Sequence, residues 1–354
     1  MKTKNFLNNI ETLAKEYELN KEQTLEAFEK SLIYGCKKNG QVKSCKLVFD
    51  KKYEEYSLYQ EYLVMEETKT DEVQTDENLE AKKITYISLE EGRKLKKNAK
   101  IGEIIYVEVD PKDFSFYASR DFKNKFNEEL IKFKRENIYN FFKNYENKLI
   151  NGKVVAINKN FFNLELEKGL QAILPKKETL ANDDFEINER IQIYVTEVQK
   201  TTKLPKILIS RTHVNFVLEI FKEFIPEIQE GIIQIINIAR FPSSRVKIGL
   251  LSNNPSIDAI GSCIGEKKSR IKNIIKILKG EKVDLFLWSE DPKELINNAL
   301  QPAEIEEINI IDLDKKIASV LVDKSQISLV IGKSGNNIRL ASQITNWNIS
   351  VKTD

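Results

Sequence analysis

A repeat in the C-terminal part of the chain constrains the fold more than any other feature. Residues 213–290 and residues 291–354 each show the order helix, strand, strand, short helix, longer helix, strand. The stretch "IGEKKSRIKNI" (264–274) aligns with "IGKSGNNIRLA" (331–341), 67 positions later. A repeated order of elements together with a repeated loop indicates two copies of one folding unit. The sequence therefore predicts two αββααβ domains.

The loop of the second copy suggests a nucleotide site, because Gly332-Lys333-Ser334 could end a P-loop. That motif is G-x-x-x-x-G-K-[ST] and follows a strand. Here the first glycine would fall on Ile327, after a predicted helix. A helix–G-x-x-G–helix turn instead lets a nucleic-acid backbone approach the free N–H groups and positive dipole end of the second helix. We interpret the turn as a clamp for about four single-stranded nucleotides, formed by Gly332, Lys333, Ser334, Gly335, Asn337 and Arg339.

The loop of the first copy departs from this pattern, since Lys268 stands where the second glycine is expected. Two interpretations remain open: a looser, electrostatic phosphate site, or a structural copy with a solvated lysine face. For the first of these, the expected RNA-binding residues are Gly265, Lys267, Lys268, Arg270 and Lys272. Arg240 and Arg245, on the predicted strands of this copy, are expected to bind RNA as well.

Residues 148–212 predict a small barrel. Strand candidates fall near 149–157, 161–166, 170–174, 190–198 and 206–211, and five short strands at this size are typical of an OB-type barrel. Phe161 and Phe162 are adjacent, so only one of them can face outward. We expect Phe161, beside Lys159, to offer an aromatic platform for bases.

Residues 1–147 predict an α/β domain. Asn20 with Gln23 indicates a helix start, and Gly35 with the following Lys-Lys-Asn-Gly stretch indicates the end of that helix. Residues 42–66 are predicted to form strands, and residues 119–147 are predicted to form a long helix. Acidic side chains gather between Glu66 and Glu80. This segment is either a solvated loop or a docking face for a basic partner surface.

Composition narrows the class of protein. The formal net charge is only +2, so any basic surface must be local. No signal peptide or apolar run of membrane-spanning length is present, which predicts a cytoplasmic protein. The three cysteines form no C-x-x-C pair, and His213 is the only histidine. These numbers argue against a disulfide framework, a metal site, a bound cofactor and a histidine-dependent active site, and His213 is expected to act near a helix start.

Particular segments resemble the NusA family of bacterial transcription elongation and termination factors. They are "ILISRTH" (207–213), "IARFPSSRVKI" (238–248), "WSEDPKELINNALQPAEI" (288–305) and "VIGKSGNNIRLASQITNW" (330–347). The resemblance covers essentially the whole chain. It implies an α+β multidomain protein: an N-terminal polymerase-binding domain (1–147), an S1 domain with the OB fold (148–212) and two type II KH domains (213–290 and 291–354).

The resemblance further implies a non-enzymatic factor that acts on RNA polymerase and nascent RNA during pausing, termination and antitermination. Its N-terminal domain would dock near the RNA exit channel, other Nus factors would join, and S1-KH-KH would form one rigid RNA-binding unit. We expect a monomer. Regulation by a C-terminal acidic extension is expected to be absent, since Asp354 follows the last strand. The alternative is an S1/KH protein of ribosome assembly or RNA decay, although residues 1–145 are too short for a ribonuclease core.

Overall fold

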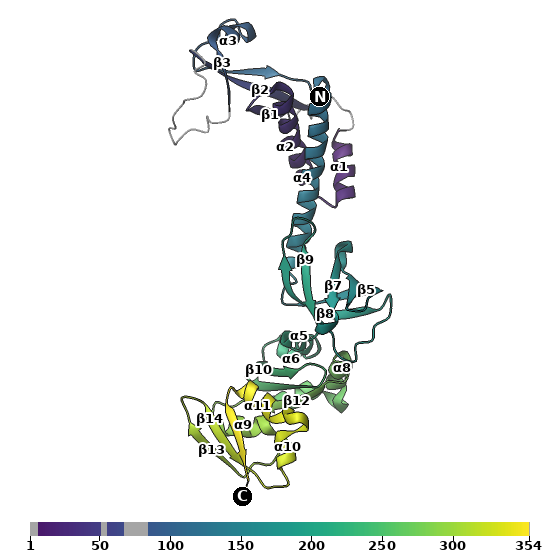
Figure 1. Ribbon diagram of the computed structural model, residues 1–354, viewed down its shortest axis with the longest axis vertical. Helices are drawn as coiled ribbons and strands as arrows, with labels where there is room; N and C mark the ends of the chain where they lie inside the picture. The colour runs from purple at the N-terminus through teal and green to yellow at the C-terminus, as the bar shows by residue number, and fades with distance from the viewer. Residues whose placement is uncertain (1–5, 51–54, 67–83, 354) are drawn as a thin grey trace. The chain divides into compact units, whose positions relative to one another are not determined.

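The computed structural model describes residues 6–50, 55–66 and 84–353. The chain forms two compact units, Met1–Ile138 and Tyr139–Asp354 (Figure 1). The helix and strand order confirms a mixed α+β protein with several domains. Within the described residues, no helix combines the length and the apolar character that crossing a membrane requires.

The first unit packs helices against a small mixed sheet. Its elements are α1 (Phe6–Tyr17), α2 (Lys21–Gly40), β1 (Cys45–Asp50), β2 (Glu55–Met65), β3 (Thr85–Ser88), α3 (Leu89–Leu95) and β4 (Ile104–Glu108), followed by α4 (Phe116–Lys143). Strand β2 is central: it pairs antiparallel with β1 and β4 and parallel with β3. Phe28 of α2 lies in the core with four aromatic rings around it, their centroids 5.0–6.0 Å from its own.

The predicted start of α2 is confirmed. The Asn20 side chain accepts from the Gln23 backbone N–H, and the Gln23 side chain accepts from the Asn20 N–H, which completes a capping box. The predicted end in the Lys-Lys-Asn-Gly stretch is confirmed, because α2 ends at Gly40, where Gln41 turns left-handed; Gly35, also predicted to end the helix, lies inside it. A Cβ on Gly35 would lie 3.0 Å from atoms of Phe114 and Phe122. This glycine therefore permits close packing and does not end the helix.

Both ends of α4 differ from expectation. Helix α4 begins at Phe116 and ends at Lys143, not at residues 119 and 147. Ser115 lies just before it and accepts from the Ala118 N–H, as a helix-capping hydroxyl does. The acidic stretch that begins at Glu66 lies, beyond Glu66 itself, outside the described residues.

The second unit begins with the predicted five-stranded barrel. Its strands are β5 (Leu149–Ile157), β6 (Phe161–Glu165), β7 (Gln171–Pro175), β8 (Arg190–Gln199) and β9 (Lys206–Ser210). They hydrogen-bond in the antiparallel order β7-β6-β5-β8-β9. Because β7 and β9 end this order without pairing to each other, the barrel stays open along that seam.

Two αββααβ copies follow the barrel, as the repeat predicts. The first has α5 (Val214–Phe224), α6 (Pro226–Gln229), β10 (Ile233–Phe241), β11 (Arg245–Ser252), α7 (Ala259–Ile264), α8 (Ser269–Ile277) and β12 (Lys282–Leu287). The second has α9 (Pro292–Leu300), β13 (Glu307–Asp312), β14 (Ile317–Leu321), α10 (Ile327–Ile331), α11 (Asn336–Thr345) and β15 (Asn348–Lys352). In each sheet the first pair of strands is antiparallel and the second parallel. The first helix of this copy is divided into α5 and α6 at Ile225, because the residue before a proline avoids the helical conformation.

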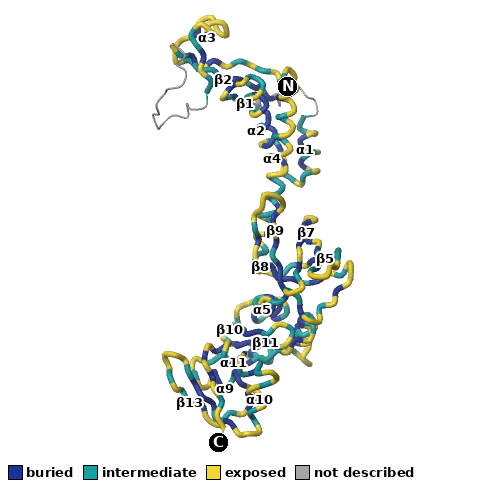
Figure 2. The backbone as a smooth tube through the Cα atoms, viewed as in Figure 1, coloured by how far each residue is buried: buried dark blue, intermediate teal, exposed yellow. Residues whose placement is uncertain are grey.

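The two copies share one hydrophobic core. Ala239 and Phe286, from strands of the first copy, pack in the same cluster as Leu340 and Ile344 of α11. Asn237 Nδ2 also donates to the Ile344 carbonyl at 2.7 Å. Helix α11 lies against β10 and β11; Figure 1 shows it close to β10, and Figure 2 shows buried residues where α11 and β11 meet. This continuous packing makes the two copies one body.

Two buried ion pairs lie where the barrel meets the first copy, one within each, and Arg211 contacts both. Arg211, just after β9, forms a bidentate pair with Asp183 of the barrel at 2.8 and 3.1 Å, and donates to the Ile277 carbonyl of α8. Arg240 of β10 forms a second bidentate pair, with Glu281 at 2.9 and 3.0 Å. The Phe216 ring lies between them, 4.9 Å from the Arg211 guanidinium carbon and 5.8 Å from that of Arg240.

Asp183→Asn should destabilise the second unit. It leaves the Arg211 guanidinium buried without its counter-charge, which costs about 3–5 kcal/mol of unfolding free energy. The two tryptophans, Trp288 and Trp347, both lie in this unit, so tryptophan fluorescence during urea denaturation of the full chain reports on it. The matched control is Glu219→Gln, which breaks the exposed pair with Lys222 and should cost no more than about 1 kcal/mol. Equal losses for the two variants would contradict the role assigned to Asp183.

Candidate nucleic-acid interface

The two predicted clamp loops have the same backbone conformation. Gly265 (φ 74°, ψ 168°) corresponds to Gly332 (φ 71°, ψ 172°). Two left-handed residues close each loop: Lys267 and Lys268 in the first copy, and Ser334 and Gly335 in the second. Both loops lead directly into a helix, α8 or α11. The missing second glycine has therefore not changed the path of the chain.

The first glycine of each loop is required by packing within the protein. Its combination of φ and ψ is accessible essentially only to glycine. A Cβ on Gly332 would lie 2.8 Å from Asn337 Cβ and 3.0 Å from Asn337 N, and one on Gly265 would lie 2.8 Å from Arg270 Cγ. Each loop consequently turns tightly against the first turn of its own helix.

The second glycine position is different, because it faces open space. A Cβ on Gly335 would meet only Arg339 Cδ, at 3.8 Å. The fold itself therefore tolerates a side chain here, and Lys268 takes this position in the first copy at a backbone cost of about 1–2 kcal/mol. A side chain at this position occupies the space outside the loop, where a phosphate backbone would approach the helix N-terminus.

Basic and aromatic groups surround the second loop. Lys333 and Arg339 are exposed, and the Arg339 guanidinium lies 5.0 Å from the centre of the Phe241 ring. Asn336 Nδ2 donates to Ser244 Oγ at 3.2 Å, so the turn between β10 and β11 of the first copy lies against this loop. Arg245 follows Ser244 and pairs with Asp284 at 2.8 Å. The structure thus brings Arg245 and Arg339 to one region, although they are far apart in sequence.

The first loop carries charge without these neighbours. Lys267, Lys268 and Lys272 are exposed. Arg270 is committed elsewhere, since its Nη1 donates to Glu227 at 2.7 Å and to the Ser262 carbonyl at 2.8 Å. Burial acts to raise the pKa of Glu227, but its backbone hydrogen bond and Arg270 outweigh this and hold the pKa below its usual range. Three lysines are therefore the available cations of this loop.

Two expected RNA contacts are internal in the structure. The Arg240 side chain is 2% exposed, and its three guanidinium nitrogens donate to Glu281 and to the His213 carbonyl. Asn337 is 3% exposed, and its Nδ2 donates to the carbonyls of Leu300 and Leu329. These groups hold the fold together. Their donors are already used inside the protein, so neither residue is among the RNA contacts proposed below.

On the barrel, Phe161 and Lys159 lie where alternation places them. Phe162 is buried at 5%, while Phe161 is partly exposed and Lys159 fully exposed. His213, in turn, has the expected structural role: its Nδ1 accepts from Asn215 N–H at the start of α5, and its ring stacks on Tyr194 at 5.0 Å.

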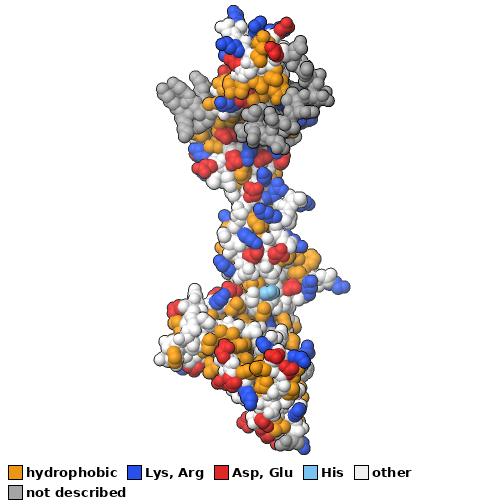
Figure 3. All heavy atoms as spheres, turned by 90° about the vertical axis from the view of Figure 1, so that its left-hand side faces the viewer, with side chains coloured by type: hydrophobic (Ala, Val, Ile, Leu, Met, Phe, Trp, Pro, Cys, Tyr) orange, Lys and Arg blue, Asp and Glu red, His pale blue; other side chains and the backbone are white. Residues whose placement is uncertain are grey.

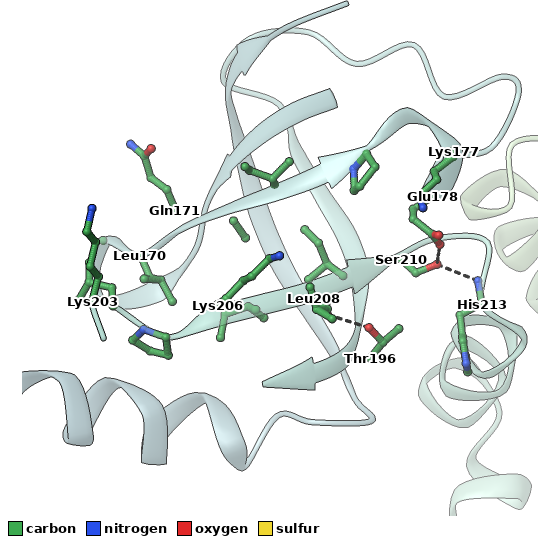
Figure 4. A pocket seen from close by; sticks show the side chains of 18 residues that line it. Leu170, Gln171, Lys177, Glu178, Thr196, Lys203, Lys206, Leu208, Ser210 and His213 are labelled. Atoms are coloured by element: carbon green, nitrogen blue, oxygen red, sulfur yellow. Dashed lines mark hydrogen bonds between the residues drawn. The ribbon is translucent and has the colours of Figure 1, made fainter. Parts of the chain in front are cut away.

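The sequence did not reveal a groove of about 970 Å³ along the open seam between β7 and β9. Its floor includes Leu170, Ile173 and Leu208, and Lys177, Lys203 and Lys206 stand around it (Figure 4). Glu178 is also at the rim, but its carboxylate accepts from the hydroxyls of Ser210 and Thr212. In Figure 3 the single histidine is visible at the surface, with hydrophobic and basic side chains nearby. Aliphatic side chains with lysines around them can pack against a base and pair with its phosphate.

No cluster of His, Cys, Asp and Glu within the described residues has an arrangement that could hold a metal ion. The three cysteines are free and buried.

Comparisons with known proteins agree along the chain. The NusA N-terminal domain matches residues 5–136, the NusA-like first KH domain residues 211–288, and the NusA-like second KH domain residues 292–354. The transcription termination/antitermination protein NusA of Halalkalibacterium halodurans is 35% identical over 350 residues, covering 99% of this chain and 88% of that protein. The Bacillus subtilis protein of the same name is 33% identical over 349 residues, covering 98% and 90%. The solution structure of the Bacillus subtilis NusA N-terminal domain covers 36% of this chain and 95% of its own, at 24% identity and a TM-score of 0.23.

Gly332→Ala should destabilise the second unit far more than Gly335→Ala. The first change forces alanine into a glycine-only conformation, costing about 1–3 kcal/mol before any clash, and its Cβ meets Asn337. At Gly335 a left-handed penalty of about 1–2 kcal/mol is offset by about 0.4–1 kcal/mol of lost unfolded-state entropy. Urea denaturation followed by tryptophan fluorescence compares the two. Similar losses would show that the two glycines do not have the separate roles described here.

Proposed function

The chain belongs to the NusA family of transcription termination/antitermination proteins, and we propose that its second unit holds nascent single-stranded RNA while its first unit binds RNA polymerase. NusA proteins are transcription factors and not enzymes. The proposal concerns which residues of this chain make each contact. It divides the chain into a polymerase-binding domain (1–147), an S1 domain (148–212) and two KH domains (213–290 and 291–354).

One observation carries the RNA half of the proposal: the open backbone position of Gly335. It lies at the N-terminus of α11, where N–H groups and the helix dipole attract phosphate. Lys333 and Arg339 add positive charge beside it. A strand leaving this loop meets Phe241 and the neighbouring Arg245 of the first KH domain. The second KH loop is therefore the main clamp.

The other RNA contacts are weaker and mainly electrostatic. Lys268 takes up space where the backbone would approach, so the first loop offers the charges of Lys267, Lys268 and Lys272 instead of a close fit. The groove between β7 and β9 adds three lysines and an apolar floor, and Phe161 with Lys159 offers a second barrel contact. Because the barrel and both KH domains are joined by buried contacts, one RNA strand can engage several of these sites at once.

The polymerase half of the proposal rests on family membership and on the surface of the first unit. Residues 5–136 match the NusA N-terminal domain. Phe116 and Tyr117, at the start of α4, are 76% and 67% exposed and form an edge-to-face ring pair. Exposed aromatic side chains of this kind are enriched where proteins bind proteins. We assign this pair to the polymerase contact.

Gly335→Asp should weaken RNA binding while the protein stays folded. Aspartate tolerates the left-handed conformation, but its charge repels phosphate, and losing one stacked base with that contact costs about 1–3 kcal/mol. The matched control is Gly335→Asn, which has nearly the same shape without the charge. It fills the same open position but does not repel phosphate, so its affinity should fall between those of the native protein and Gly335→Asp. Fluorescence anisotropy with a labelled single-stranded RNA measures both, and circular dichroism checks folding. Unchanged affinity for Gly335→Asp would disprove the clamp.

The first loop is tested by combining Lys267→Glu with Lys268→Glu at two salt concentrations. For single strands, log K falls with log salt by about 0.7 for each phosphate contact. If the first loop binds phosphate, the double variant flattens the slope by about 0.7–1.4 and lowers affinity. An unchanged slope would leave this loop as a structural copy.

Separating the two halves of the chain should separate the two activities. We expect residues 1–147 to co-migrate with core RNA polymerase without RNA, and Phe116→Ala with Tyr117→Ala to weaken this. Residues 148–354 should bind RNA but fail to enhance pausing, because tethering to polymerase supplies the effective RNA concentration. Pausing enhancement by 148–354 alone, at ordinary concentrations, would refute this division.

A further inference from the structure

Two of the three cysteines touch each other inside the first unit. Cys36, near the end of α2, is fully buried, and Cys45, the first residue of β1, is 8% exposed. Cys45 Sγ donates a hydrogen bond to Cys36 Sγ across 2.8 Å, and both thiols are free. Since a disulfide bond is about 2.05 Å long, the sulfurs need to approach by less than about 1 Å to bond.

The backbone around the pair is held on both sides. Helix α2 ends at Gln41, whose N–H donates to the Lys37 carbonyl, and Val42 N–H donates to the same carbonyl at 3.1 Å. Cys45 is paired with Gln60 across β1 and β2. The Gln60 side chain lies against Gly40, where any Cβ would come within 2.1 Å of it. The segment between the cysteines is thus fixed, which keeps the two sulfurs together.

The surroundings also favour one of the two sulfurs as the reacting group. The hydrogen bond from Cys45 lowers the pKa of Cys36, and Gln60 and the charge of Lys37 act in the same direction against the effect of burial. The same hydrogen bond raises the pKa of Cys45, and burial adds to this. The thiolate therefore forms on Cys36, and the thiolate is the form that reacts with oxidants.

We propose that Cys36 and Cys45 are a built-in oxidation site that closes to an intramolecular disulfide when the protein meets hydrogen peroxide. A small oxidant is required because both sulfurs are buried. The Cys36 thiolate attacks one peroxide oxygen, the O–O bond breaks, and Cys36 sulfenic acid and hydroxide form. The Cys45 sulfur then attacks the Cys36 sulfur, the S–O bond breaks, and the oxygen leaves as water with the Cys45 proton. The proton first lost from Cys36 converts the hydroxide to a second water, so two thiols and one peroxide give one disulfide and two waters.

Cys263 provides an internal comparison. It is fully buried in the first KH domain, and burial raises the pKa of its thiol to about 12. It packs in a different cluster from the other two cysteines. Burial alone therefore predicts slow oxidation for all three cysteines, whereas the sulfur contact predicts fast oxidation of one pair only.

The experiment uses the reduced full-length chain, hydrogen peroxide, alkylation of the remaining thiols and digestion with trypsin. Cleavage after Lys37, Lys38 and Lys43 places the two cysteines in separate peptides, 31–37 and 44–46. Mass spectrometry should find these two peptides joined after peroxide and separate after reduction. Formation of this link should be at least about tenfold faster than loss of the Cys263 thiol.

Variants identify the step and guard against misfolding. Cys263→Ser should leave the link unchanged. Cys45→Ser should abolish the disulfide link and let the Cys36 sulfenic acid accumulate, and dimedone then captures this acid. Cys45→Ala is the second variant at this position. Thermal melts show which of the two variants folds. Recovery of both peptides fully alkylated, at a peroxide dose that oxidises added free cysteine, would overturn the proposal. A bond to Cys263, or bonds only between molecules, would overturn it as well.

Discussion

Phe216 contacts two buried guanidinium groups where the barrel meets the first KH domain. Arg211 reaches it from the end of the barrel, and Arg240 reaches it from the first KH sheet. A guanidinium in the interior is stable only with a carboxylate partner, and Asp183 and Glu281 provide one each. A desolvated cation over an aromatic face contributes about 2 kcal/mol. These polar contacts have fixed geometry, so they set the orientation of the barrel relative to the first KH domain.

Arg240 shows that the role of a basic residue depends on its neighbours in the fold. In the sequence, Arg240 and Arg245 belong to one basic segment of an RNA-binding domain. In the structure, Arg240 is used by Glu281 and the His213 carbonyl, while Arg245 lies beside the turn that meets the second KH loop. Arg240 and Arg245 lie on the two strands of one hairpin, β10 and β11. Side chains alternate between the two faces along a strand, so the two arginines meet different neighbours. Charge count alone does not identify an RNA contact.

The two KH copies show how a repeat keeps its fold and varies its binding. Both loops adopt the same dihedral angles, although one holds Lys268 where the other holds Gly335. The first glycine of each loop is fixed by contacts within the protein, whereas the second position faces outward. Lys268 gives the first copy a side chain and a positive charge at the position that Gly335 leaves open in the second.

The sequence predicted the order of elements, the five barrel strands, the KH repeat and the capping box at Asn20. Each of these depends on local periodicity and on side chains a few residues apart. Gly35 was misread as a helix end, since its role depends on Phe114 and Phe122 from a distant segment. The sequence also did not predict the groove between β7 and β9, the internal roles of Arg240 and Asn337, or the contact of Cys36 with Cys45. Each of these joins residues that are distant in the chain or lie on elements whose pairing is not encoded locally. The sequence by itself determined which elements form and where the two glycine-containing loops lie. Only tertiary packing decided which polar groups near those loops remain free, because a buried donor must satisfy its hydrogen bonds within the protein.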